Sequence, residues 1–102
     1  MTPGGKGPKM AEVAEAHVLV TGRVQGVWFR GNTQRAAAEA GVHGWVRNLP
    51  DRRVEAVLQG ERAAVERVID FMRTGPPGAV VTDCAVSWRP AGERIHGFDV
   101  RY

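Results

Sequence analysis

Apolar side chains recur at the period of a helix in two segments of the chain. In the first segment, spacings of four, three, one and three place on one face Phe29, Thr33, Ala36, Ala37 and Ala40. Gly41 follows as a C-terminal cap. In the second, from about residue 61 to residue 74, one face collects Ala64, Val65, Val68, Ile69 and Met72, and Gly75 with two prolines ends the segment. The pattern predicts two amphipathic helices, each of which needs a sheet to cover.

Five other segments have the β-branched and aliphatic residues typical of strands, bounded by turn signals. A strand is predicted over residues 16–24, a hairpin over residues 42–48 and 53–59, and a short last strand over residues 97–102. Residues 79–88 alternate in character, which predicts a long half-buried strand. One side of that strand would carry Val80, Thr82, Cys84, Val86 and Trp88, and the other side Val81, Asp83, Ala85 and Ser87.

The order of these elements is that of the split βαβ, or ferredoxin-like, sandwich with one strand added at the end. This α+β fold is an antiparallel sheet with two helices on one face. The chain has 102 residues and a hydrophobic content of 43%, enough for one domain, which we assign to residues 13–102. Residues 1–12 have no apolar run, so we expect a flexible tail and neither a signal peptide nor a membrane span.

Charge and cysteine content narrow the function only slightly. The formal net charge of +3 favours anionic ligands without distinguishing small phosphates from nucleic acid or acidic lipid. Cys84 is the only cysteine, so no disulfide can form within the chain, and we expect a cytoplasmic protein. The histidines His17, His43 and His96 are scattered and lack the spacing of a metal site, so we expect no metal and no other cofactor.

The segment from Gly22 to Arg30 has the chemistry of an anion site. A strand ends there, Gly26 allows the backbone to turn, and a helix begins whose first N–H groups have no intrahelical partner. Arg30 adds a planar fork of donors that suits two oxygens of a phosphate or carboxylate. Taken alone, these features also fit an ordinary turn followed by a solvated arginine. The segment lacks the G-x-x-x-x-G-K-[ST] pattern of nucleotide-binding loops, so ATP or GTP binding is not supported.

Two motifs carry a resemblance to a known family. The sequence GRVQGVWFR at residues 22–30 resembles the first acylphosphatase signature, Gly-x-Val-Gln-Gly-Val-x-Phe-Arg, at every fixed position. The sequence GWVRNLPDRRVEAVLQG at residues 44–60 is similar to the second signature, including Asn48, Val54 and Gly60. The likeness covers about residues 16–102. The family usually places glycine in the hairpin turn where this chain has Arg52, so we expect another turn type or a strain of about 1 kcal/mol there.

The resemblance implies a hydrolase that cleaves acyl phosphates to a carboxylate and inorganic phosphate. It implies that Asn48 orients the attacking water and that the phosphoryl group is held by Arg30 and by the backbone of a loop that comprises Gln25, Gly26, Val27, Trp28 and Phe29. We assign Gln25 to shaping this loop. Because a carboxylate is a good leaving group, no covalent nucleophile is required. The expected partner is a small-molecule acyl phosphate, and we expect a monomer that binds neither nucleic acid nor membrane.

Alternatives from other classes share this topology, because one fold can host many functions. A non-catalytic phosphate-binding module is one, and a piece of a larger hydrogenase-maturation protein is another, although the short chain argues against the latter. An RNA-binding module is a third, but residues 53–58 contain an acid and none of the aromatics of such modules. The tryptophans Trp28, Trp45 and Trp88 fall in three different elements, so we expect core and boundary positions rather than a stacking platform.

Overall fold

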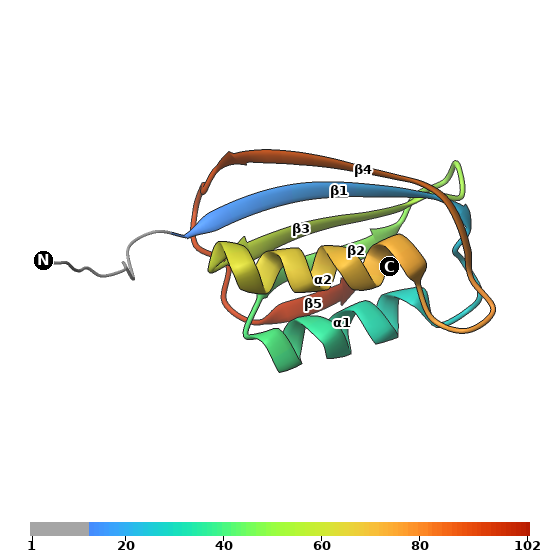
Figure 1. Cartoon of the computed structure of the whole chain (residues 1–102), viewed down its shortest axis with the longest axis horizontal. Helices are drawn as coiled ribbons and strands as arrows, with labels where there is room; N and C mark the ends of the chain where they lie inside the picture. The colour runs from blue at the N-terminus through green and yellow to red at the C-terminus, as the bar shows by residue number, and fades with distance from the viewer. Residues whose placement is uncertain (1–12) are drawn as a thin grey trace, which may run out of the picture.

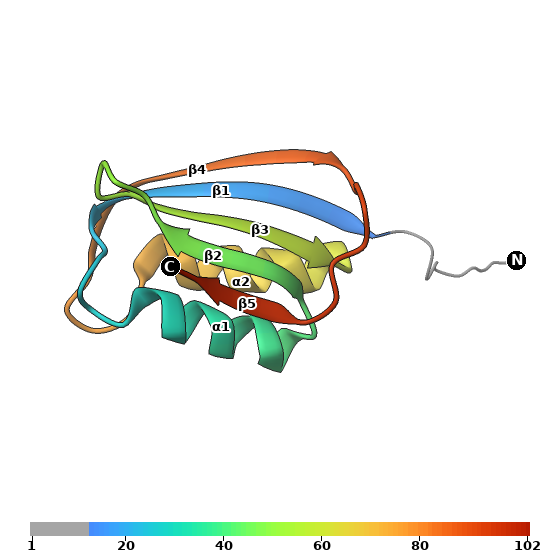
Figure 2. The ribbon, with the colours of Figure 1, turned by 180° about the vertical axis from the view of Figure 1, so that it is seen from behind.

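The computed structural model describes residues 13–102 and contains the elements that the sequence predicts, in the predicted order (Figures 1 and 2). They are β1 (Ala14–Arg23), α1 (Phe29–Ala40), β2 (His43–Asn48), β3 (Val54–Gly60), α2 (Arg62–Thr74), β4 (Val80–Pro90) and β5 (Phe98–Arg101). The expected tail at residues 1–12 lies outside the described residues. Neither helix of residues 13–102 is long and apolar enough to cross a membrane.

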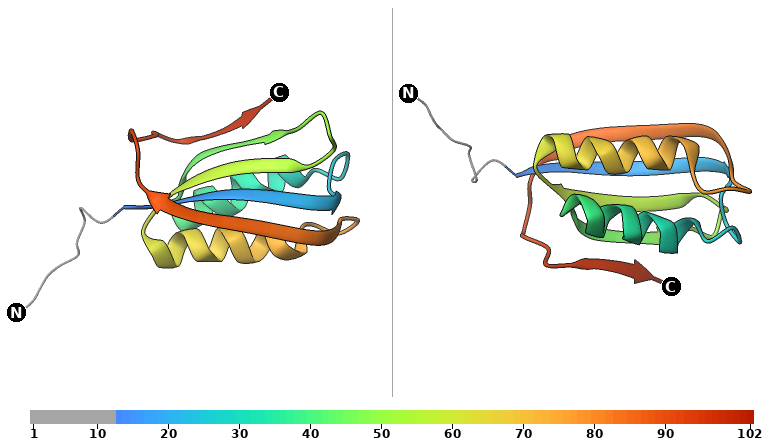
Figure 3. Two further views of the ribbon diagram at one scale, coloured as in Figure 1. Left: turned by 90° about the horizontal axis from the view of Figure 1, so that it is seen from above. Right: turned by 60° about the horizontal axis from the view of Figure 1, so that its bottom comes forward.

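The five strands form one sheet in the order β4-β1-β3-β2-β5, and both helices lie on the same face of it (Figure 3). The ferredoxin-like prediction is therefore confirmed. The pairs β1 with β3, β1 with β4 and β2 with β3 are antiparallel. The added strand β5 differs from the predicted antiparallel arrangement, because it pairs in parallel with β2. After β4 the chain runs across one end of the sheet before it enters β5 at the opposite edge (Figure 3).

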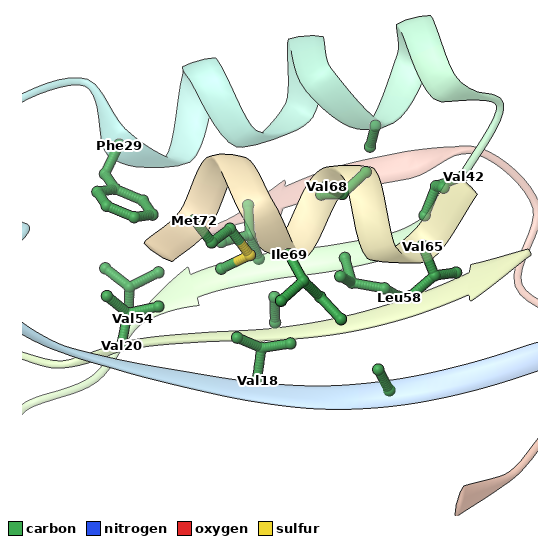
Figure 4. Packing of buried hydrophobic residues seen from close by; sticks show 14 of the residues in the cluster. Val18, Val20, Phe29, Val42, Val54, Leu58, Val65, Val68, Ile69 and Met72 are labelled. Atoms are coloured by element: carbon green, nitrogen blue, oxygen red, sulfur yellow. The ribbon is translucent and has the colours of Figure 1, made fainter. Parts of the chain in front are cut away.

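The core lies between the sheet and the two helices (Figure 4). Alternate residues of the two central strands are buried against the helices: Ala16, Val18, Val20, Val54, Ala56 and Leu58. The buried residues of α2 are the five that its periodicity predicts: Ala64, Val65, Val68, Ile69 and Met72. Burial of each large aliphatic side chain contributes about 1.5–3 kcal/mol. Helix α1 ends at Gly41, where a φ of 73° confirms the predicted glycine cap.

Near its first residues, strand β4 departs from the predicted alternation of buried and exposed side chains. The pairing register between β1 and β4 shifts between Thr21 and Gly22, so one residue of β4 has no partner on β1. As a result Val81 packs against the core, while Val80 is 54% exposed. The prediction that Val80 shares a side with Cys84 and Val86 is wrong for this reason.

The hairpin turn between β2 and β3 is a three-residue loop in which Arg52 adopts a left-handed conformation. The N–H of Arg52 donates to the carbonyl of Leu49 at 3.0 Å, and the N–H of Leu49 donates to the carbonyl of Arg53 at 2.8 Å. Arg52 has a φ of 78°, as in hairpin loops of three residues that end in a left-handed position. Glycine suits that position better, so the expected strain of about 1 kcal/mol fits this geometry.

The segment between β4 and β5 is fixed by a buried carboxylate on β1. Glu15 accepts hydrogen bonds from Gln59 Nε2 at 2.7 Å, from the N–H of Gly92 at 3.1 Å and from Arg89 Nε. Burial raises the pKa of the Glu15 carboxyl, but these hydrogen bonds outweigh burial and leave its pKa below the ordinary value. The Glu15 carboxylate thereby helps to place β5, whose far end reaches the site described next.

Candidate active site

A hollow of about 710 Å³ lies where the β1–α1 loop, the end of β2 and the end of β5 meet. Its lining residues are Val24, Gly26, Trp28, Phe29, Arg30, Gly31, Gln34, Asn48, Asp99, Val100 and Tyr102. Figure 2 shows the ends of β2 and β5 beside the start of α1. The two motifs singled out in the sequence therefore meet at one hollow, and β5 supplies its third side.

The loop between β1 and α1 turns its backbone N–H groups away from other protein groups. Gly26 has a φ of 77° and Trp28 a φ of 61°, with ordinary negative φ at Val27 between them. Within residues 13–102, the N–H groups of residues 26–31 donate to no protein acceptor. Such alternation in the sign of φ at a helix start forms a concave group of donors, and the helix dipole adds partial positive charge. This geometry favours an anion with several oxygens.

Arg30 is oriented by the end of β5. Its Nη1 donates to the carbonyl oxygen of Arg101 at 2.8 Å, and its Cζ lies 4.3 Å from the ring centroid of Tyr102. These contacts hold the guanidinium at the side of the hollow, because a planar fork with one donor fixed loses most of its rotational freedom. The other N–H donors of Arg30 make no hydrogen bond to residues 13–102. They remain free to bind an anion in the hollow.

Asn48 is the last residue of β2 and is half-buried at the rim of the same hollow. Its carboxamide makes no hydrogen bond to any group in the described part of the chain. An amide side chain offers one acceptor oxygen and a donor group, and it does not titrate near neutral pH. Asn48 can thus bind a water molecule in the hollow that Arg30 also lines.

Gln25 does not line the hollow but connects its two sides. Its Nε2 donates to the carbonyl of Leu49 at 2.9 Å and to the carbonyl of Arg53 at 3.0 Å. Both acceptors belong to the turn of the β2–β3 hairpin, which begins directly after Asn48. The loop and the hairpin are therefore bonded to one another by this side chain.

The other residues of the predicted loop divide between site and core. Gly26, Trp28, Phe29 and Arg30 line the hollow. The ring of Phe29 is only 2% exposed and lies 6.0 Å from that of Phe71, so this residue offers the site its backbone rather than its ring. Val27 packs against the core and does not line the hollow.

Trp28 corrects one expectation from the sequence. It was expected at a core or boundary position, but its side chain is 82% exposed at the mouth of the hollow. Its backbone holds the N-cap position of α1 in the left-handed region, where a residue without a Cβ fits best. A buried ring at this position would have to turn back under α1, where Phe29 already fills the core.

Sequence reasoning missed the residues that β5 brings to the site, namely Asp99, Val100, Arg101 and Tyr102. No local motif marks them, because the bond to Arg30 uses a backbone carbonyl that any residue could provide. Asp99 is the carboxylate among the lining residues, and Arg30 is the cation. Within residues 13–102, no group of three or more His, Cys, Asp or Glu side chains is arranged to hold a metal ion.

Fold and site together define a ferredoxin-like domain with a strand-loop-helix junction whose backbone N–H groups at residues 26–31 donate to no acceptor in residues 13–102. The family model for acylphosphatase matches residues 16–100. The chain is 58% identical over 79 residues to the acylphosphatase of Gloeobacter violaceus, covering 78% of this chain and 85% of that protein. It is 50% identical over 93 residues to the acylphosphatase of an Anaeromyxobacter species, covering 91% of this chain and 100% of that protein.

A solved structure agrees with these sequence relatives. The crystal structure of acylphosphatase from Bacillus subtilis superposes with a TM-score of 0.84 at 35% identity, covering 87% of this chain and 99% of that one. The chain belongs to the acylphosphatase family.

Proposed function

We propose that this chain is a hydrolase that cleaves acyl phosphates to a carboxylate and inorganic phosphate, with Arg30 and the loop amides holding the phosphoryl group and Asn48 orienting the water. The observation that carries the proposal is that Arg30, Asn48 and the unpaired N–H groups after Gly26 border one hollow. Membership of the acylphosphatase family supports the reaction, and the geometry supports the roles.

The phosphoryl group fits the donors on the loop side of the hollow. Its oxygens can accept from the N–H groups of residues 26–31 and from the free donors of Arg30. In phosphoryl transfer, negative charge is spread over the equatorial oxygens, so donors fixed around them stabilise the transition state by position and charge. Each hydrogen bond to a charged group contributes about 1.5–3 kcal/mol.

Asn48 would orient the water molecule that attacks phosphorus. Its oxygen accepts a hydrogen bond from a water molecule whose own oxygen faces phosphorus on the side opposite the leaving carboxylate. The new bond joins the water oxygen to phosphorus, and the bond from phosphorus to the carboxylate oxygen breaks with its electron pair on the carboxylate. The proton lost by the water passes to a phosphate oxygen. A carboxylate in place of Asn48 would repel the substrate, so a neutral amide suits this position.

The proposal includes a small-molecule substrate, a monomeric and cytoplasmic protein, and no binding of nucleic acid. The face of the sheet opposite the helices supports the last point. There Glu55 on β3 lies 2.7 Å from Nε2 of His17 and accepts from Nε of Arg47 at 2.7 Å. These contacts give the acid two basic partners on a face that RNA-recognition modules leave to stacking aromatics.

The experiment that tests the proposal measures phosphate release from acetyl phosphate and benzoyl phosphate by the wild type, Arg30→Ala and Arg30→Lys. We expect Arg30→Ala to lower kcat/KM by about two or more powers of ten, because two charged hydrogen bonds are lost. Arg30→Lys should recover little, since a point charge does not reproduce the fork. Binding of inorganic phosphate without hydrolysis by the wild type would identify a non-catalytic module instead. Size exclusion and an RNA gel shift test the monomer and nucleic-acid statements.

A further inference from the structure

Trp28 is the tryptophan whose side chain has no packing role in the fold. Trp45 lies beneath the guanidinium groups of Arg47 and Arg101, at 5.3 and 4.6 Å, and Trp88 lies 3.9 Å beneath that of Arg62. Within residues 13–102, Trp28 has no such cation partner and makes no side-chain hydrogen bond. Its side chain is 82% exposed, although burial of an aromatic ring of this size is strongly stabilising.

The indole of Trp28 borders the hollow next to a position without a side chain. A Cβ at Gly31 would lie 4.0 Å from Cε3 of Trp28, so the ring lies beside the first turn of α1. Gly31 itself lines the hollow and leaves the surface next to the ring open. Val100 and Tyr102 also line the hollow, and the 99% exposed Tyr102 places its ring centroid 4.3 Å from Cζ of Arg30. Apolar surface therefore continues outward from the anion-binding donors.

The hollow is larger than a phosphoryl group requires. With a volume of about 710 Å³ it falls in the range of sites for small organic ligands, which are about 300–1,000 Å³. In an acyl phosphate, one bridging oxygen separates phosphorus from the acyl carbon. Once the phosphoryl group is bound by the loop and Arg30, the acyl group must begin within a few ångströms of it and lie in the remaining space.

We propose that Trp28, with Gly31 beside it and Tyr102 on the same lining, forms the subsite for the acyl group and makes the enzyme prefer acyl phosphates with a flat, apolar acyl group. This inference rests on the proposed function. The ring of Trp28 offers a planar face for stacking, and Gly31 leaves room for a planar group beside it. The side chain of Trp28 acts on specificity and takes no part in the bond-breaking step.

The charge of the lining favours a neutral acyl group. Arg30 is the cation among the lining residues, and the phosphoryl group occupies its free donors. Asp99 remains on the same lining and would repel a second negative charge on the acyl group. The preferred substrate class is therefore a monoanionic or dianionic acyl phosphate whose only charge is on its phosphate.

The test compares benzoyl phosphate with acetyl phosphate, because the two share the phosphoryl group and differ only in the acyl group. For Trp28→Ala we expect kcat/KM for benzoyl phosphate to fall about tenfold more than that for acetyl phosphate. Trp28→Phe should restore most of the benzoyl preference, because it keeps an aromatic face. Trp88→Leu, which changes a tryptophan far from the hollow, should leave the ratio of the two values unchanged.

A binding measurement separates this inference from the proposed function. Calorimetry with benzylphosphonate and with inorganic phosphate needs no turnover, and Trp28→Ala should weaken binding of the first about tenfold more than binding of the second. A ratio of benzoyl to acetyl kcat/KM that Trp28→Ala leaves within about twofold of wild type would overturn the subsite while the hydrolase stands. A wild type that hydrolyses neither compound would overturn the hydrolase, and equal weakening of both ligands by Trp28→Ala would overturn the subsite.

Discussion

Gln25 and Leu49 join the two motifs of the site: Nε2 of Gln25 donates to the carbonyl oxygen of Leu49 at 2.9 Å. The same nitrogen donates to the carbonyl of Arg53 at 3.0 Å, so one amide is bonded to both ends of the hairpin turn. Asn48 is the residue directly before Leu49. The position of the Asn48 amide relative to the β1–α1 loop therefore depends on a side chain that itself does not line the hollow.

Replacement of Gln25 by Ala should lower kcat by about tenfold or more, because an error of about 1 Å in the alignment of reacting groups is costly. The loss of two half-buried hydrogen bonds should also reduce the free energy of unfolding by about 1–2 kcal/mol. Kinetics well below the melting temperature separate the two effects, since a purely structural role would leave kcat unchanged there. Gln25→Glu keeps the length but presents oxygens to two carbonyls. Full activity in this variant would contradict the positioning role.

Asn48→Ala should separate substrate binding from turnover. The donors of the loop and of Arg30 are intact in this variant, so inorganic phosphate should bind within about threefold of wild type. The water loses its acceptor, and kcat should fall by about a hundredfold or more. Isothermal titration with phosphate and initial-rate kinetics measure the two quantities. As a matched change, Asn48→Asp should weaken phosphate binding through like-charge repulsion, and unchanged kcat in both variants would remove Asn48 from the mechanism.

Arg52→Gly should stabilise the protein. The φ of 78° at Arg52 costs about 1 kcal/mol for a residue with a Cβ, and glycine does not have that cost. We expect a gain of about 0.5–1 kcal/mol in the free energy of unfolding in urea. Arg52→Ala retains the Cβ and serves as the control, and the difference between the two variants isolates the backbone effect. Since Arg52 does not line the hollow, kcat should stay at the wild-type value.

The buried carboxylate of Glu15 should make stability depend on pH. Its hydrogen bonds leave the pKa of Glu15 below the ordinary value, despite the opposing effect of burial. The folded state is therefore stabilised above the pKa of the unfolded chain, and this contribution is lost as pH falls through the folded pKa. Glu15→Gln should cost about 1–3 kcal/mol at pH 7 and should show a smaller loss than wild type between about pH 5 and pH 3.

Urea unfolding at several pH values measures this effect. Glu39→Gln, which changes an exposed carboxylate on α1, is the control and should retain the acid dependence of wild type. If the free energies of unfolding of Glu15→Gln and wild type fell equally as the pH is lowered, the carboxylate of Glu15 would not contribute to the pH dependence.

The sequence predicted those parts of the fold that depend on neighbours along the chain. The buried face of α2 follows from the spacing of Val65, Val68 and Met72, and the end of α1 follows from Gly41. The side that Val80 faces depends instead on a register shift against β1, which contacts it from far away in the sequence. The direction of β5 likewise depends on the path of the preceding segment around the end of the sheet, for which no short pattern exists.

In the candidate site, too, some features could be predicted from the sequence and others depend on distant parts of the chain. Arg30 and Gly26 could be selected from the sequence because their chemistry lies in a side chain or in a turn, whereas Asn48 was selected through the resemblance of the second motif. The hydrogen-bond partners of Arg30 and Gln25 could not be predicted from the sequence, because both side chains donate to backbone carbonyls, which every residue carries. The exposure of Trp28 was missed because the prediction rested on the three tryptophans falling in three different elements, which does not determine the direction of each side chain.

The contact between Arg30 and the carbonyl of Arg101 joins residues that are 71 positions apart. During synthesis, the loop, α1 and the β2–β3 hairpin leave the ribosome long before β5 does. The arginine then has no acceptor to hold it, and one wall of the hollow is missing. Enzyme activity would thus report the formation of β5: a molecule in which β5 has not yet paired could have its helices and central strands in place and still lack an ordered guanidinium.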